Sequence, residues 1–134
     1  MLLPCWLSRL VAGEGADLGA KGERIAARHL RDAGYEIIDR NRRVGRDEAD
    51  VIALAPDRDT LVIVEVKTRA DDAIDPFVNI DRTKQAHLAR LAARLQRRSA
   101  YRNRPVRFDA IAVIVRGNAD PVVRHLEGAF ESPF

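Results

Sequence analysis

The segment Leu61–Val66 (LVIVEV) constrains the fold more than any other part of this chain. It is almost continuously apolar, which is the pattern of a central strand covered on both faces by other parts of a protein. One charged residue, Glu65, interrupts it. The segment therefore indicates a layered α/β protein and marks Glu65 as a charge where burial is expected.

Patterns around this strand predict the other elements. Asp81 can cap a helix, and the apolar residues before Gly34 recur at helical spacing. The expected order is a helix at 18–33, strands at 35–40, 48–54 and 61–66, a helix at 82–98 and strands at 107–115 and 121–126, with loops at 41–46 and 71–80. This order predicts a mixed sheet with a right-handed crossover from 61–66 through the second helix to 107–115.

Length and composition predict one soluble domain. The chain has 134 residues, 46% hydrophobic and 32% charged, which suits a single core at 18–134. Residues 1–17 are expected to form a weakly ordered N-terminal extension. Cys5 is the one cysteine, which excludes an intrachain disulfide and fits a cytoplasmic location. Apolar runs are too short to span a membrane, so a membrane partner is not expected.

Glu65 and Lys67 are two residues apart on one strand, so their side chains point to the same face. A buried charge is costly unless it is paired or bound to a metal. An ordinary ion pair at a strand end is therefore one interpretation of these two residues, and a metal site is the other.

Asp50 strengthens the second interpretation. It lies on the preceding strand, where it shares a face with Glu48, and a hairpin would bring it near Glu65. Two close carboxylates raise each other's pKa, and a hard divalent cation with oxygen ligands relieves that repulsion. The spacing therefore predicts a metal site made by Asp50 and Glu65.

Two further charged residues fall on the apolar sides of helices. Glu23 aligns with core positions of the first helix, where it is either part of the site or a carboxylate favoured by the helix dipole. Lys84 aligns with Leu88 and Leu91 on the second helix, where it is either part of the site or a snorkelling lysine. The sequence leaves both alternatives open.

Basic residues are segregated along the chain, although the net charge is only +3. Residues 82–107 contain nine Lys or Arg and no acid, and four more arginines (40, 42, 43 and 46) precede Asp50. Such a surface beside an acidic metal site suits a polyanionic substrate. Aromatic residues make up 5%, so contacts with a nucleic-acid backbone are expected rather than base stacking.

Other chemistries find no pattern in the sequence. A Gly-rich phosphate loop followed by Lys and Ser or Thr is absent. A single cysteine makes a zinc cluster implausible, and the three histidines lack ligand spacing.

The ordered motifs from about Leu18 to Phe130 resemble the UPF0102 (YraN-like) family of small bacterial proteins. They are Gly22-Glu23, Asn41 and Arg43, Glu48-x-Asp50-Val51-Ile52, Val64-Glu65-Val66-Lys67-x-Arg69, Lys84, Arg107-Phe108-Asp109 and Ala129-Phe130. That family is similar to the PD-(D/E)XK restriction-endonuclease-like superfamily and to archaeal Holliday junction resolvases. One departure is Asp47-Glu48-Ala49-Asp50, where the family usually has Gly-Glu-Ile-Asp, and this substitution is expected to alter the local geometry.

The resemblance implies an α/β fold with an αβββαβ core and a mixed central sheet flanked by helices. It also implies a site in which Asp50 and Glu65 hold Mg²⁺ or Mn²⁺, Glu23 assists, and Lys67 positions or activates the attacking water. Residues expected to contact nucleic acid are Arg43, Arg46, Arg69, Lys84, Arg90, Arg94 and Arg98.

The leading hypothesis is a metal-dependent endonuclease acting on double-stranded, branched or junction DNA, and a junction substrate would call for a homodimer. A non-catalytic nucleic-acid-binding module that retains the fold is the main alternative. An interaction protein whose acidic cluster is only structural is the third.

Overall fold

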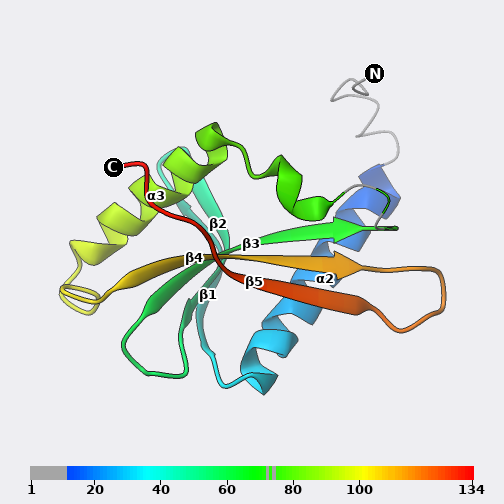
Figure 1. The fold of residues 1–134 in the computed structure, drawn as a ribbon, viewed down its shortest axis with the longest axis horizontal. Coiled ribbons are helices and arrows are strands. Elements are labelled where there is room, and N and C mark those ends of the chain that lie inside the picture. Colours follow the sequence, from blue (N-terminus) through cyan, green and yellow to red (C-terminus); the bar gives the residue numbers. More distant parts are fainter. Residues whose placement is uncertain (1–11, 72, 74) are drawn as a thin grey trace.

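The structure is a computed structural model that describes residues 12–134, except residues 72 and 74. Its elements are α2 (Ala12–Asp32), β1 (Glu36–Val44), β2 (Asp47–Leu54), β3 (Leu61–Arg69), the 3₁₀ helix η1 (Pro76–Asn79), α3 (Arg82–Gln96), β4 (Val106–Ile114) and β5 (Val122–Phe130) (Figure 1). Among the described helices, none is both long and apolar enough to cross a membrane.

The five strands form one sheet in the order β1-β2-β3-β4-β5. Only β3 and β4 pair in parallel, and α3 connects them, while the other neighbours are antiparallel. The predicted α/β class and mixed central sheet are therefore confirmed, and the arrangement is a restriction-endonuclease-like core.

Two apolar clusters cover the two faces of the sheet. Ala26 and Leu30 of α2 pack on one face against residues such as Val62 and Val64. Leu88 and Leu91 of α3 pack on the other face with Ile63 and its neighbours. In Figure 1, α3 lies in front of the sheet and α2 lies behind it. Because β3 is covered on both sides, its continuous apolar pattern is explained.

Several predicted boundaries need correction. The predicted loop at 41–46 is wrong for 41–44, because β1 continues to Val44 and the turn is confined to Gly45 and Arg46. Gly45 has a φ of 62°, which an L side chain rarely adopts, so one glycine suffices to reverse the chain. β5 extends to Phe130 rather than 126, and α3 ends at Gln96 rather than 98.

The predicted N-terminal extension also differs from the structure. α2 begins at Ala12, so residues 12–17 are helical, and residues 1–11 lie outside the described residues. The predicted cap of α3 is confirmed, because Asp81 Oδ1 accepts a hydrogen bond from the Lys84 backbone N–H at 2.8 Å. That cap fixes the helix end that carries the Lys84 side chain.

Gly22 allows α2 to approach the end of β3. A Cβ atom at this position would overlap the side chain of Thr68, whereas a Cβ at Gly19, one turn earlier, would meet open space. Gly22→Ala is therefore expected to cost about 1–3 kcal/mol of unfolding free energy through overpacking. Gly19→Ala should instead stabilise the helix by about 1 kcal/mol. Urea denaturation of both variants tests this, and equal effects would contradict the close approach.

Candidate active site

Glu65 is 5% exposed and lies in the middle of the central strand β3. Lys67 follows on the same face, and its Nζ is 3.3 Å from Glu65 Oε1. The expected common face of Glu65 and Lys67 is therefore confirmed. The pair sits where β3 becomes half-exposed, so a carboxylate and an ammonium group meet at the edge of the core.

Asp50 is brought to the same place by the β2–β3 pairing. Val51 pairs with Val64, so the next position places Asp50 level with Glu65. The Val66 backbone N–H donates a hydrogen bond of 2.8 Å to Asp50 Oδ2. The carboxylate of Asp50 therefore crosses to β3, and the predicted proximity of Asp50 to Glu65 is confirmed.

The regular alternation on which the expected common face of Glu48 and Asp50 depends does not continue through Asp50. Ala49 and Ile52 both pack in the α3-side cluster, whereas Val51 packs on the α2 side, so the period-two alternation is interrupted at Asp50. Glu48 turns outward and pairs with Arg43 at 3.3 Å. The interruption lets Asp50 face the neighbouring strand instead of following Glu48.

Burial of Asp50, followed by the nearby charge of Glu65, raises the pKa of Asp50 to about 7. The charge of Glu23 on α2 contributes to this rise in the pKa of Asp50. The hydrogen bond from Val66 and the charge of Lys84 act in the opposite direction. The charges of nearby acids therefore raise the pKa of Asp50 by more than the charge of Lys84 lowers it.

Lys84 reaches the site from the first turn of α3. Its Nζ is 3.5 Å from Glu65 Oε2 and donates a hydrogen bond of 3.4 Å to the Glu48 backbone carbonyl. Glu65 Oε2 is nevertheless buried without a hydrogen-bond partner. A buried carboxylate oxygen with unused acceptor capacity is a position that a cation or a donor would satisfy.

The carboxylate oxygens of this site fit a magnesium ion that is bound by only a few protein ligands. Among the described residues, no group of three or more His, Cys, Asp or Glu is arranged to hold a metal. Mg²⁺, however, is usually bound through one or two carboxylates and keeps several waters. Such a pair is provided by Asp50, whose pKa is raised, and Glu65, whose Oε2 is buried without a hydrogen-bond partner.

Several arginines expected to contact nucleic acid have internal partners instead. Arg90 makes two hydrogen bonds to the carboxylate of Asp47, at 2.8 and 3.1 Å. Arg94 donates to the Val44 carbonyl, and Arg69 donates to the Thr68 carbonyl. The basic stretch on α3 is therefore partly used to attach the helix to the sheet.

The other expected contacts lie at the surface. Arg43 is exposed and pairs with Glu48. Arg46 and Arg98 are exposed and make no ion pair with the described residues. These three residues lie at separate places: on β1, in the turn between β1 and β2, and just after the end of α3.

Asp47 explains the departure from the family pattern. It is 2% exposed, and the hydrogen bonds from Arg90 outweigh the effect of burial and lower its pKa. The acid at this position therefore serves a buried ion pair that connects β2 to α3, and it does not contribute to the site of Asp50 and Glu65.

A third buried acid, Asp109, was not assigned a role from the sequence. It is fully buried on β4, and its carboxylate accepts two hydrogen bonds of 2.8 Å from Arg107 and one of 3.0 Å from the Gly128 backbone N–H. His125 Nε2 lies 2.8 Å away, and Tyr35 contacts both Arg107 and Glu127. Asp109 interrupts an apolar strand as Glu65 does, so the same signal was present in the sequence.

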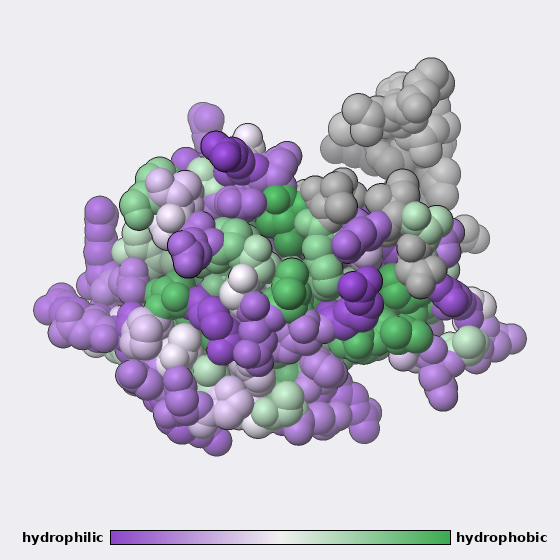
Figure 2. Space-filling model, viewed as in Figure 1, coloured by the Kyte–Doolittle hydropathy of each residue, from purple (hydrophilic) through white to green (hydrophobic). Residues whose placement is uncertain are grey.

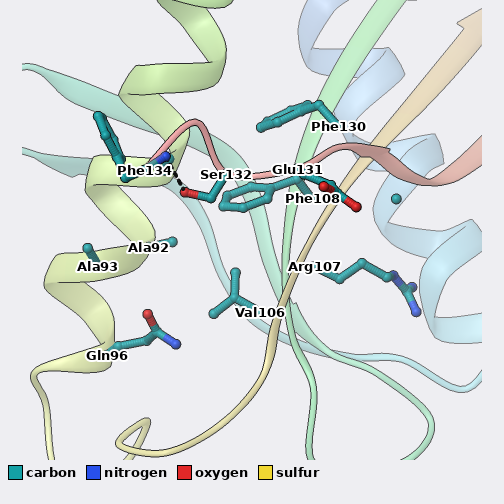
Figure 3. Close-up of a pocket in the computed structure, with 12 residues that line it drawn as sticks. Ala92, Ala93, Gln96, Val106, Arg107, Phe108, Phe130, Glu131, Ser132 and Phe134 are labelled. Carbon is teal, nitrogen blue, oxygen red and sulfur yellow. Dashed lines mark hydrogen bonds between the residues drawn. The ribbon is translucent and has the colours of Figure 1, made fainter.

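The apolar hollow between α3 and the beginning of β4 is separate from these residues. It has a volume of about 430 Å³ and is lined by Ala92 and Val106, among others (Figure 3). Phe108 and Phe130 stack there with ring centroids 4.8 Å apart, while Arg107 points away from the hollow. Neither Asp50 nor Glu65 lines it, and it carries no arrangement suited to hydrolysis.

The mixed sheet, the two flanking helices and the acidic cluster on β2 and β3 define a restriction-endonuclease-like α/β protein. Comparison with known sequences then gives the family. The profile described as "Uncharacterised protein family UPF0102" matches residues 22–113. This chain belongs to the UPF0102 family.

Relatives align over most of both chains. A UPF0102 protein of Geotalea uraniireducens (strain Rf4) is 35% identical, covering 88% of this chain and 92% of the relative. One from Arthrobacter sp. (strain FB24) is 43% identical, covering 83% and 93%, respectively. A third, from Pseudarthrobacter chlorophenolicus, is 44% identical, covering 85% and 86%. The family resemblance expected from the motifs is therefore confirmed.

Proposed function

We propose that this protein is a Mg²⁺-dependent endonuclease that hydrolyses phosphodiester bonds in double-stranded or branched DNA. The observation that carries the proposal is the convergence of Asp50 and Glu65, with Lys67 Nζ 3.3 Å from Glu65. Two carboxylates and a lysine on adjacent strands suit metal-assisted attack on a phosphate.

Each side chain has a role that follows from its position. Asp50 and Glu65, with the backbone carbonyl of Val66, would hold the cation, while Glu23 adds negative charge beside Asp50. When bound, Mg²⁺ would neutralise charge on the phosphate and assist deprotonation of the attacking water. Lys67 orients that water or stabilises the charge that develops during attack.

Lys84 balances Glu65 when the cation is absent and contacts a substrate phosphate when it is present. Its Nζ lies between the Glu65 carboxylate and the Glu48 carbonyl, at the N-terminal end of α3. An ammonium group on a flexible stem can move from one acceptor to another with little cost, which suits this change of partner.

The non-catalytic nucleic-acid-binding module is a second candidate, and one observation favours it. Lys67 and Lys84 both lie against Glu65, so two ammonium groups already compensate its charge without a metal. In this alternative, the acidic cluster keeps α3 attached to β3 and substrate turnover does not occur.

A cleavage assay on linear, nicked and branched DNA with Mg²⁺ or Mn²⁺ separates the two. For a nuclease, Asp50→Asn and Lys67→Met should each reduce cleavage by about 100-fold or more while leaving DNA binding intact. Asp120→Asn, an exposed change in the β4–β5 turn, is the matched control. Wild-type cleavage by both site variants would overturn the site, and binding without any cleavage would favour the module.

A further inference from the structure

The outer face of α2 carries a row of arginines that the sequence-based assignment of nucleic-acid contacts did not include. Arg24, Arg28 and Arg31 are exposed and follow at helical spacing, so they share one side of the helix. Together with Arg40 of β1 and a single acid, Asp32, they line a groove of about 550 Å³. Four cations and one anion therefore face the same concave surface.

These four arginines make no ion pair with the described residues. Arg40 Nε is, in addition, buried without a hydrogen-bond partner. The contrast with the α3 region is direct, because there four arginines have partners within the protein: Arg90, Arg94, Arg104 and Arg107. The groove beside α2 thus contains guanidinium groups whose hydrogen-bond donors are available to a ligand.

We propose that this groove binds consecutive phosphates of a nucleic-acid strand and leads that strand to the site of Asp50 and Glu65, an inference that rests on the proposed function for its substrate class. From Arg24 to Arg31, α2 rises by about 10 Å, which matches the length of about three nucleotides of a B-form strand. Arginine binds phosphate in a bidentate manner, and the groove lining has no aromatic residue on which a base could stack.

The groove begins beside the site. Arg24 directly follows Glu23, whose charge acts on Asp50. Arg40 directly precedes Asn41, which lies between the pairs Arg40–Val51 and Arg42–Ala49 and is therefore level with Asp50. The groove therefore lies beside the strand pair that carries Asp50.

The same groove is poorly suited to an anionic membrane. A membrane-binding surface combines basic residues with exposed apolar anchors. The exposed large apolar side chains of the described chain are Val122, Leu126 and Phe134, and none of them lines the groove. Figure 2 shows one face of the molecule, on which apolar patches are interspersed with hydrophilic side chains.

The test compares two triple variants that remove the same charge. Arg24→Gln/Arg28→Gln/Arg31→Gln removes the row on α2, and Arg97→Gln/Arg98→Gln/Arg102→Gln removes three exposed arginines after the last turn of α3 that make no ion pair with the described residues. Binding of a fluorescein-labelled DNA duplex is measured by anisotropy in EDTA between about 50 and 200 mM salt. Circular dichroism verifies that both variants are folded.

The α2 variant should lower the slope of log K against log salt by about 3 and weaken binding at least tenfold, because each lost phosphate contact contributes about 0.9 to the slope. The α3 variant should change the slope by less than 1. The charge-conserving α2 variant Arg24→Lys/Arg28→Lys/Arg31→Lys should retain most of the wild-type slope. Equal effects of the two Gln variants would overturn the proposal. Loss of binding to phosphatidylserine vesicles with unchanged DNA binding would also overturn it, in favour of a membrane surface.

This measurement is independent of cleavage. If the wild type never cuts DNA but the α2 variant loses binding, the groove stands and the nuclease proposal fails. If the wild type cuts DNA and the α2 variant binds and cuts DNA normally, the nuclease proposal is supported and the groove proposal is contradicted.

Discussion

Replacing Asp109 with Ala is expected to lower the free energy of unfolding by about 3 kcal/mol, because the half-buried Arg107 loses both hydrogen bonds to this carboxylate. The Gly128 N–H and His125 lose their acceptor at the same time. Urea denaturation at pH 7 measures the change. Asp59→Ala removes an exposed acid 3.9 Å from Arg104 and should cost less than about 0.5 kcal/mol.

The pH dependence of this contribution has a definite sign. Burial alone would raise the pKa of Asp109, but hydrogen bonds from His125, Arg107 and Gly128 outweigh it and hold the pKa below 3.8. The stabilisation is therefore present above pH 4 and is lost as the pH falls through the folded-state pKa. A loss in the Asp109 variant no larger than that in the Asp59 variant would show that the network contributes nothing to stability.

Replacing Asp50 with Asn is expected to have the opposite effect and to stabilise the metal-free protein at pH 8 by about 1–3 kcal/mol. The pKa of Asp50 is raised from 3.8 to about 7, so the folded state prefers the protonated acid. Stability from this preference is complete below pH 4 and is lost as the pH rises through 7. Asparagine is neutral at every pH and can still accept the hydrogen bond from Val66.

Urea denaturation in EDTA at pH 5 and pH 8 measures this difference, with Asp120→Asn as the exposed control. Wild-type stability should fall between the two pH values, and that of the Asp50 variant should fall less. Adding Mn²⁺ at pH 8 should stabilise the wild type and leave the variant unchanged, as expected when a ligand binds only the native site. A variant less stable than the wild type at pH 8 in EDTA would show that Asp50 is not a strained charge.

The parts of the site that were predicted correctly depend on local regularities. Glu65 and Lys67 share a face because strand side chains alternate, and Asp50 lies near them because a hairpin connects β2 to β3. The interruption of the alternation at Asp50 was not predictable in this way. It depends on a hydrogen bond from Val66, which is 16 residues further along the chain.

The arginines illustrate the same limit over longer distances. Arg90 was predicted to contact a substrate because its partner, Asp47, is 43 residues away in sequence and no local pattern connects the two. Conversely, the row from Arg24 to Arg31 was visible as a helical spacing, but Arg40 joins it only through the packing of α2 beside β1. Charge segregation along the chain therefore located basic residues without showing which ones have partners within the protein.

The irregularity that delivers the Gly128 N–H to Asp109 also affects how this protein meets its own copies. Phe108 pairs with Phe130 and Ala110 with Leu126, so three residues of β5 face Asp109 alone, and Gly128 adopts a φ of 61°. The opposite edge strand, β1, has a register shift after Ile37 and a φ of 51° at Asn41. A bent edge cannot present an even row of free N–H and C=O groups to another strand. Both margins of the sheet therefore resist edge-to-edge aggregation, and on one of them this protection comes from the same bulge that satisfies a buried acid.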